Sequence, residues 1–158
     1  MRRSPIIICL MLLLASPVMA GNVWNFTSVG FSVDMDGNVG NAVQTGVATF
    51  ISTNAYIVAS AQYDRDINNP EEGYGLQGTY GYILSKFFTV TGSLSGIKTE
   101  TPEGTIGYGL VNATVSLFPW GNLYQDGKEK VGATLGFSYK PATEKLVGYL
   151  QVTTFFGK

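Results

Sequence analysis

Apolar and small polar side chains alternate with a period of two residues along much of this chain, and this alternation most constrains its fold. The clearest example is 131–139, where glycine, threonine and serine alternate with Val131, Ala133, Leu135, Phe137 and Tyr139. Segments 73–84 and 87–97 follow the same pattern. Successive side chains of a β-strand point to opposite faces, whereas a helix repeats every 3.6 residues. The sequence therefore predicts an all-β protein.

Eight such segments are separated by turn residues. The expected strands are 23–33, 42–51, 55–63, 73–84, 87–97, 105–117, 131–139 and 146–156. Most reach the roughly 9–11 residues that a tilted strand needs to cross a bilayer. Within 105–117 the apolar residues change face, which indicates a β-bulge near Leu110 and Val111. The segment 23–33 shows a similar change of face.

Charged residues avoid these strands. Of ten basic and eleven acidic residues, only Arg2 and Arg3 precede residue 21, so nineteen charged residues follow it. All nineteen fall in expected connections, at strand ends or at the C-terminus. A soluble sheet usually exposes charged side chains on its wet face, whereas a lysine or arginine facing mid-bilayer lipid costs about 2–4 kcal/mol. We therefore expect a closed antiparallel barrel, because open sheet edges are not tolerated in lipid.

The first twenty residues have the pattern of a cleaved secretory signal peptide. Arg2 and Arg3 precede an apolar run at 6–15, and small residues at Val18 and Ala20 suit a cleavage site. A transmembrane helix needs about 20 apolar residues, roughly twice this run. Cys9, the only cysteine, lies inside the run, so lipid attachment is not expected. We predict a signal peptide at 1–20 and one β-barrel domain at 21–158, the mature chain.

The mature chain resembles the small eight-stranded outer-membrane barrels of Gram-negative bacteria. The resemblance is one of architecture, and it implies an up-and-down barrel of about eight strands in the outer membrane. Two features differ from the usual family pattern. The family usually ends its last strand on a C-terminal aromatic residue, whereas Gly157 and Lys158 follow Phe156 here. Family interiors often carry charge networks, whereas the interior expected here is nearly neutral.

Loops and aromatic residues are also expected to follow the membrane pattern. Connections 34–41, 64–72 and 98–104 are predicted to be long and to share one end, while 52–54 and 85–86 are short turns; 119–130 is long where a short turn is expected. Aromatic residues near strand ends suit interfacial girdles. They are Trp24, Phe26, Tyr56, Tyr63, Tyr74, Tyr82, Phe87, Phe88, Phe118, Trp120, Tyr139, Tyr149, Phe155 and Phe156.

Several kinds of site are not expected. Histidine is absent from the chain, which excludes Ser-His-Asp and Cys-His catalysis and histidine-ligated metals. The stretch 34–38 resembles the start of a calcium loop, but Thr45 stands where the twelfth-position carboxylate belongs. The mature chain has a net charge of −3, which gives no basic surface for nucleic acid. We predict no catalytic residue, no metal and no cofactor.

The function that this pattern favours is a non-enzymatic outer-membrane barrel with a structural or adhesive role. Its expected partners are membrane lipid and an extracellular or envelope partner that binds acidic loops, chiefly Asp64–Asp66 and Glu71–Glu72. Alternation alone does not tell which face is inside. A soluble periplasmic or secreted barrel that carries an apolar ligand therefore remains an alternative, as does a secreted β-rich fibre subunit. A pore is less favoured, because eight strands leave little lumen.

Overall fold

A computed structural model describes residues 23–67, 72–101, 103–118 and 130–156, with the side chain of Asp66 left out. The strands are β1 (Val23–Asp34), β2 (Val39–Ser52), β3 (Ala55–Asp66), β4 (Glu72–Ile83), β5 (Phe88–Thr101), β6 (Gly104–Leu117), β7 (Lys130–Lys140) and β8 (Lys145–Phe156), with a 3-10 turn, η1 (Pro141–Thr143), before β8. The expected signal peptide and residues 157–158 lie outside the described residues. In the part described, no helix is long and apolar enough to cross a membrane.

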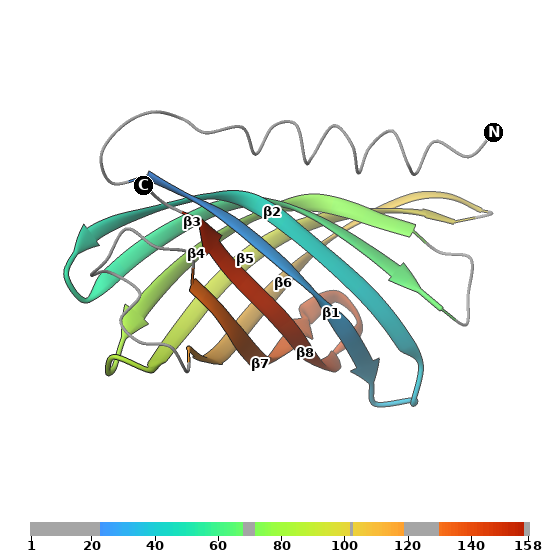
Figure 1. Cartoon of the computed structure of the whole chain (residues 1–158). Coiled ribbons are helices and arrows are strands. Elements are labelled where there is room, and N and C mark those ends of the chain that lie inside the picture. The colour runs from blue at the N-terminus through green and yellow to red at the C-terminus, as the bar shows by residue number, and fades with distance from the viewer. Residues whose placement is uncertain (1–22, 68–71, 102, 119–129, 157–158) are drawn as a thin grey trace.

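Each strand pairs antiparallel with its neighbours, and β1 pairs with β8 to close the barrel (Figure 1). All eight predicted strands are present, and the structure extends most of them by a few residues. One end, called here the loop end, carries the connections 35–38, 67–71, 102–103 and 141–144. The other, the turn end, carries the connections 53–54, 84–87 and 118–129.

The alternation places apolar side chains outside and small polar side chains inside. The outer face exposes large apolar residues such as Leu76, 73% exposed, and Leu94, 68% exposed. The inner face buries serine, threonine, asparagine and glutamine, as on β5, where Thr89, Ser93 and Ser95 point into the lumen. This distribution confirms the predicted all-β barrel. The interior is mostly uncharged, but it is not free of charge, because Lys130 is buried and Asp64 lines the lumen. The distribution also gives the orientation that alternation alone left open.

The predicted β-bulges are wrong. The pairing of β5 with β6 continues without a shift through Leu110 and Val111, and β1 pairs with β2 just as regularly. The apolar residues change face because Tyr108 and Leu110 point into the lumen at the loop end, while Trp24 points into it at the turn end. The register shift that does occur lies at the end of β2, between Phe50 and Ser52, next to the turn into β3.

The loops at the loop end are shorter than predicted, because charged residues continue the strands. Asp64 and Arg65 belong to β3, while Lys98 and Glu100 belong to β5. The expected contrast between long loops at one end and short turns at the other is therefore not found. The pairing of β6 with β7 covers only 111–117, so the tip of the β5–β6 hairpin extends past β7 (Figure 1).

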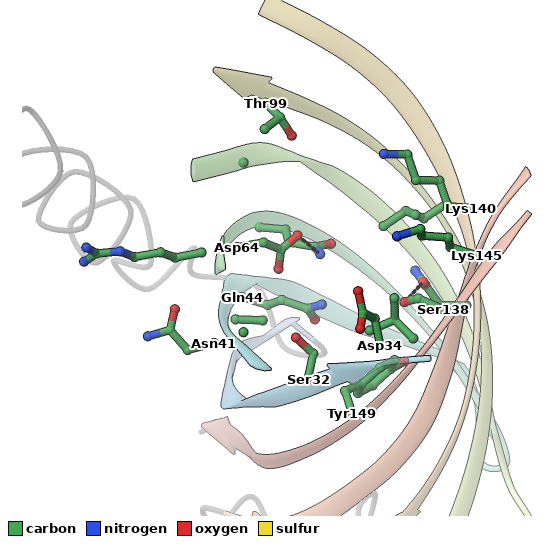
Figure 2. Close-up of a pocket in the computed structure, with 18 of the residues that line it drawn as sticks. Ser32, Asp34, Asn41, Gln44, Asp64, Thr99, Ser138, Lys140, Lys145 and Tyr149 are labelled. Atoms are coloured by element: carbon green, nitrogen blue, oxygen red, sulfur yellow. Dashed lines mark hydrogen bonds between the residues drawn. The ribbon is translucent and has the colours of Figure 1, made fainter. Parts of the chain in front are cut away.

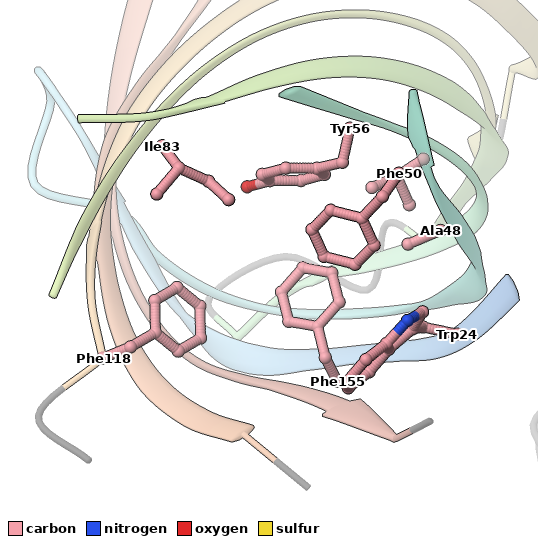
Figure 3. Packing of buried hydrophobic residues seen from close by; sticks show 8 residues of the cluster. Trp24, Ala48, Phe50, Tyr56, Ile83, Phe118 and Phe155 are labelled. Carbon is pink, nitrogen blue, oxygen red and sulfur yellow. The ribbon is translucent and has the colours of Figure 1, made fainter. Parts of the chain in front are cut away.

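Aromatic side chains fill the turn end of the lumen (Figure 3). Phe155, 1% exposed, lies at the centre of the cluster, and its ring centroid is 5.3 to 5.8 Å from those of Phe26, Tyr56 and Phe118. Trp24 packs edge-on against Phe50 in the same cluster. The girdle prediction is therefore wrong for Trp24, Phe26, Tyr56, Phe118, Tyr149 and Phe155, which lie inside. Tyr82, Phe88, Tyr139 and Phe156 do face outward.

Candidate functional site

A polar cavity of about 430 Å³ opens at the loop end of the barrel (Figure 2). Its size falls within the range of about 300–1,000 Å³ that is usual for small-molecule pockets. Every strand contributes to its wall, because the lumen is enclosed by the whole barrel. At the turn end of the described barrel, the aromatic cluster occupies the lumen instead.

The floor of the cavity is an amide and hydroxyl network whose members satisfy one another. Gln77 Oε1 accepts from Gln44 Nε2 at 3.2 Å and from Ser95 Oγ at 3.2 Å. Asn112 Nδ2 donates to Ser93 Oγ and Ser95 Oγ, at 3.1 and 2.9 Å. Buried polar groups that are paired in this way hold a fixed geometry. The floor is therefore a preorganised, uncharged layer across the barrel.

The β3 wall is different, because it presents acceptors that are not all used. Gln62 is only 6% exposed, and its Nε2 donates to Asp64 Oδ2 at 2.7 Å. Among the described residues, Gln62 Oε1 has no hydrogen-bond partner. A buried polar atom left unpaired costs about 1–3 kcal/mol. Gln62 and Asp64 therefore form the part of the wall best able to accept hydrogen bonds from a ligand.

The β8 wall carries Tyr149 and Gln151. The ring of Tyr149 lies against Gly136, where an added Cβ would stand 2.7 Å from the tyrosine hydroxyl. Gln151 accepts a hydrogen bond from Ser28 through Oε1, at 2.9 Å, so the donor that it can offer is Nε2. Gly136 thus makes room for the ring of Tyr149. The β8 wall can supply hydrogen-bond donors, whereas the β3 wall supplies hydrogen-bond acceptors.

Lysines stand at the rim of the cavity. Figure 2 shows Asp64 on one side and Lys140 with Lys145 on the other. The Lys145 ammonium forms an ion pair of 2.7 Å with Asp36, and the Lys140 ammonium lies 3.5 Å from the centre of the Tyr108 ring. Both cations are therefore engaged with neighbouring side chains.

Asp34, which begins the calcium-like stretch, closes its own turn. Its Oδ1 accepts from the backbone N–H groups of Asp36 and Asn38, at 2.9 and 2.8 Å, and its Oδ2 accepts from Asn38 Nδ2 at 2.9 Å. Gly37 has a φ of +81°, which suits glycine in such a turn. The stretch is a hairpin turn, and Thr45 lies away from it on β2. Within the described ranges no three potential metal ligands gather.

The predicted acidic loop is divided by the fold. Asp64 is half-buried and lines the cavity instead of standing at a loop tip. Arg65 lies opposite Glu72 in the backbone pairing of β3 with β4. Glu71 and the side chain of Asp66 lie outside what the structure describes. Of residues 118–121, which the sequence places at the end of the sixth strand, the structure describes only Phe118, which is buried in the aromatic cluster.

Sequence reasoning missed the cavity because amide side chains inside a barrel form no motif. One signal was present: Gln44 on β2 pairs directly with Gln62 on β3, and Asp64 follows on the same face. Polar residues at neighbouring inward positions near one end of two paired strands indicate a polar lumen at that end.

Below the floor, the lumen narrows sharply. A second cavity of about 40 Å³ lies between the amide layer and the aromatic cluster, bordered by Gln77 on one side and Phe155 on the other. Hydroxyl groups form a chain around the wall at this level, from Ser116 through Thr134 to Thr153, with distances of 2.8 Å for both links. The space here is enough for about one water molecule.

Comparison with solved structures gives the same architecture. The barrel is similar to Neisserial surface protein A, NspA, with a TM-score of 0.59 over 86% of this chain and 96% of that chain, at 10% sequence identity. It is also similar to the N-terminal β-barrel domain of Pseudomonas aeruginosa OprF, with a TM-score of 0.53 over 87% and 100% of the two chains, at 12% identity. No family model matches the sequence. No curated protein matches it significantly.

Both similar structures are small eight-stranded outer-membrane β-barrels. This chain therefore has the fold of that class, as its sequence predicted. At such low identity the likeness concerns the fold alone.

Proposed function

We propose that the mature chain is a non-enzymatic outer-membrane barrel, closed to solutes, that acts through its loop end in a structural or adhesive role. In this proposal residues 1–20 direct export and are removed, and residues 21–158 insert into the membrane. The partners are lipid around the barrel and a molecule outside the cell at the loop end. In this proposal the loop end, where the polar cavity opens, faces outward.

One observation carries the proposal, namely the apolar outer face of a closed barrel. Leu76 on β4, Leu94 on β5, Phe137 on β7 and Leu150 on β8 are each exposed by more than half. Monomeric soluble proteins rarely expose contiguous apolar patches beyond a few hundred Å². Lipid is the surrounding that makes such a surface favourable, and closure satisfies the backbone groups that lipid cannot.

The polar lumen argues against the soluble carrier. Such a protein needs an apolar inner face for its ligand, whereas Gln44, Gln77 and Asn112 cross the middle of this lumen. The aromatic cluster is apolar but tightly packed, with neighbouring ring centroids less than 6 Å apart. The same lumen argues against a wide pore, because amides and aromatic rings fill it.

Refolding tests the proposal directly. The mature chain, unfolded in urea, is diluted into buffer alone or into buffer with phosphatidylcholine vesicles, and folding is followed by circular dichroism and by migration of unheated samples in electrophoresis. We expect a folded, protease-resistant barrel only with vesicles. A soluble, monomeric, folded protein in buffer alone contradicts the proposal, and thioflavin-binding aggregates in both conditions favour the fibre subunit instead.

A further inference from the structure

The loop-end cavity is built to exchange hydrogen bonds with a ligand. Its floor is satisfied internally, but Gln62 Oε1 on its wall is buried and, within the described part of the chain, has no partner. The neighbouring Asp64 carboxylate has four acceptor positions, of which Gln62 Nε2 occupies one. On β8, Tyr149 and Gln151 supply an O–H and an N–H donor. Acceptors and donors thus line different walls of one cavity.

The charges around the cavity favour a neutral ligand. Asp64 repels an anion from the β3 wall, and the two rim lysines that would attract one are engaged, Lys145 by Asp36 and Lys140 by the face of the Tyr108 ring. Arg65 also borders the cavity, but it follows the inward-facing Asp64 on β3 and is exposed on the other face of the strand. An amine would suit Asp64 and Gln62, but it would leave the donors of the β8 wall without acceptors. Hydroxyl groups both donate and accept, so a neutral polyhydroxylated ligand satisfies both walls.

We propose that this cavity binds a neutral saccharide of one or two rings, either free in solution or at the end of a surface glycan. The volume of about 430 Å³ is suited to a ligand of that size. Hydroxyl groups of the sugar donate to Gln62 Oε1 and Asp64, and they accept from Tyr149 and Gln151. The inference rests on the proposed function, because it requires the loop end to face outward, and it gives that function a class of partner.

Binding by the folded mature protein in detergent micelles tests the inference. Lactose, maltose and N,N′-diacetylchitobiose are titrated as free sugars by calorimetry, and the same sugars displayed on beads are tested for capture of the protein. We expect at least one of them to bind. Capture by beads together with free-sugar binding indicates recognition of the sugar itself, and capture by beads alone indicates a glycan; both support the inference.

Variants on one face of β3 localise the binding. Gln62→Leu removes the unpartnered acceptor and should weaken binding by about tenfold, the worth of one good hydrogen bond. Asp64→Asn keeps the shape of the side chain and should weaken sugar binding several-fold. It tests the same wall of the cavity if Gln62→Leu does not fold. Ser60→Ala is the matched control: Ser60 Oγ is also buried without a partner among the described residues, but Ser60 does not line the cavity. Its affinity should equal that of the wild type.

The result that overturns the inference is a folded protein that binds none of these sugars, or one whose binding is unchanged in both cavity variants. Competition by methylammonium or inorganic phosphate at the same site also overturns it, because the ligand would then be charged. Unheated electrophoresis of the same samples keeps the two proposals apart. A barrel that inserts into vesicles but binds no sugar refutes only the saccharide, whereas a chain that never inserts refutes the membrane function itself.

Discussion

At the residue scale, the barrel interior depends on glycines that make room for large neighbours. Gly81 on β4 lies directly opposite Tyr56 on β3, and an added Cβ would stand 2.2 Å from Cζ of that ring. Gly132 makes similar room for Phe118, with 2.6 Å to the nearest ring atom. The sequence shows these glycines only as members of alternating strands. Which of them face a ring depends on the pairing register, which one strand alone does not contain.

Gly81→Ala should therefore destabilise the barrel, because the new methyl group displaces Tyr56 from the aromatic cluster. Overpacking of this kind costs about 1–3 kcal/mol in the free energy of unfolding. Gly92→Ala is the matched control, since Gly92 lies on β5 with no atom within 4 Å of an added Cβ. It should leave stability unchanged or raise it slightly, because glycine weakens a strand. Urea unfolding followed by tryptophan fluorescence measures both; equal stabilities would contradict the packing described here.

The hydrogen bonds of the inward-facing amide side chains could not be predicted from the sequence. A period-two pattern puts Gln44, Gln62 and Gln77 on inner faces once the orientation is known. It does not show that Gln77 is satisfied by three neighbours while an atom of Gln62 is left over. That difference depends on side-chain geometry across several strands, and it is what distinguishes the floor of the cavity from its wall.

At the scale of the element, strands were predictable and loops were not. Uncharged alternation identified all eight strands, because burial on one face alone imposes a period of two. Charged residues do not mark the loops as predicted, because Asp64, Arg65, Lys98 and Glu100 continue their strands at the loop end. Where a barrel wall extends beyond the apolar band, a charged side chain on a strand has no lipid to avoid.

A charge placed on the outer face tests the depth of that band. Leu94 lies near the middle of β5 and is 68% exposed, so Leu94→Arg should lower the free energy of unfolding in vesicles by about 2–4 kcal/mol. Leu84 is equally apolar and exposed, but it lies in the β4–β5 turn. Leu84→Arg should cost only about 0–1 kcal/mol. If the two variants lose the same stability, the outer face does not meet the lipid interior.

At the scale of the whole molecule, closure gives one lumen with three levels: a polar cavity at the loop end, an amide and hydroxyl layer, and an aromatic cluster at the turn end. The number of strands could be predicted from the sequence, and the small lumen followed from that number. The aromatic cluster could not, because aromatic residues near strand ends suit either a girdle or a core. Because β1 pairs with β8, the sheet closes and encloses Phe26, Tyr56 and Phe155 in a core inside the barrel.

This arrangement predicts a barrel that does not conduct. Purified mature protein inserted into a planar bilayer should give no stepwise ion current, because Phe155 and its neighbours fill the turn end and only about 40 Å³ lies above them. Unheated electrophoresis of protein recovered from the same lipid confirms that it was inserted and folded. Discrete, reproducible conductance steps from such a preparation would show that the lumen opens.

The central claim is that the apolar outer face of the closed barrel lies in an outer membrane. Cell fractionation of a Gram-negative host that expresses the full chain tests it most directly, with the membrane fraction washed in carbonate and then examined by electrophoresis with and without heating. We expect the mature protein to remain in the washed outer-membrane fraction and to migrate differently when unheated. Recovery as a soluble periplasmic or secreted protein, with one mobility in both conditions, would contradict the account.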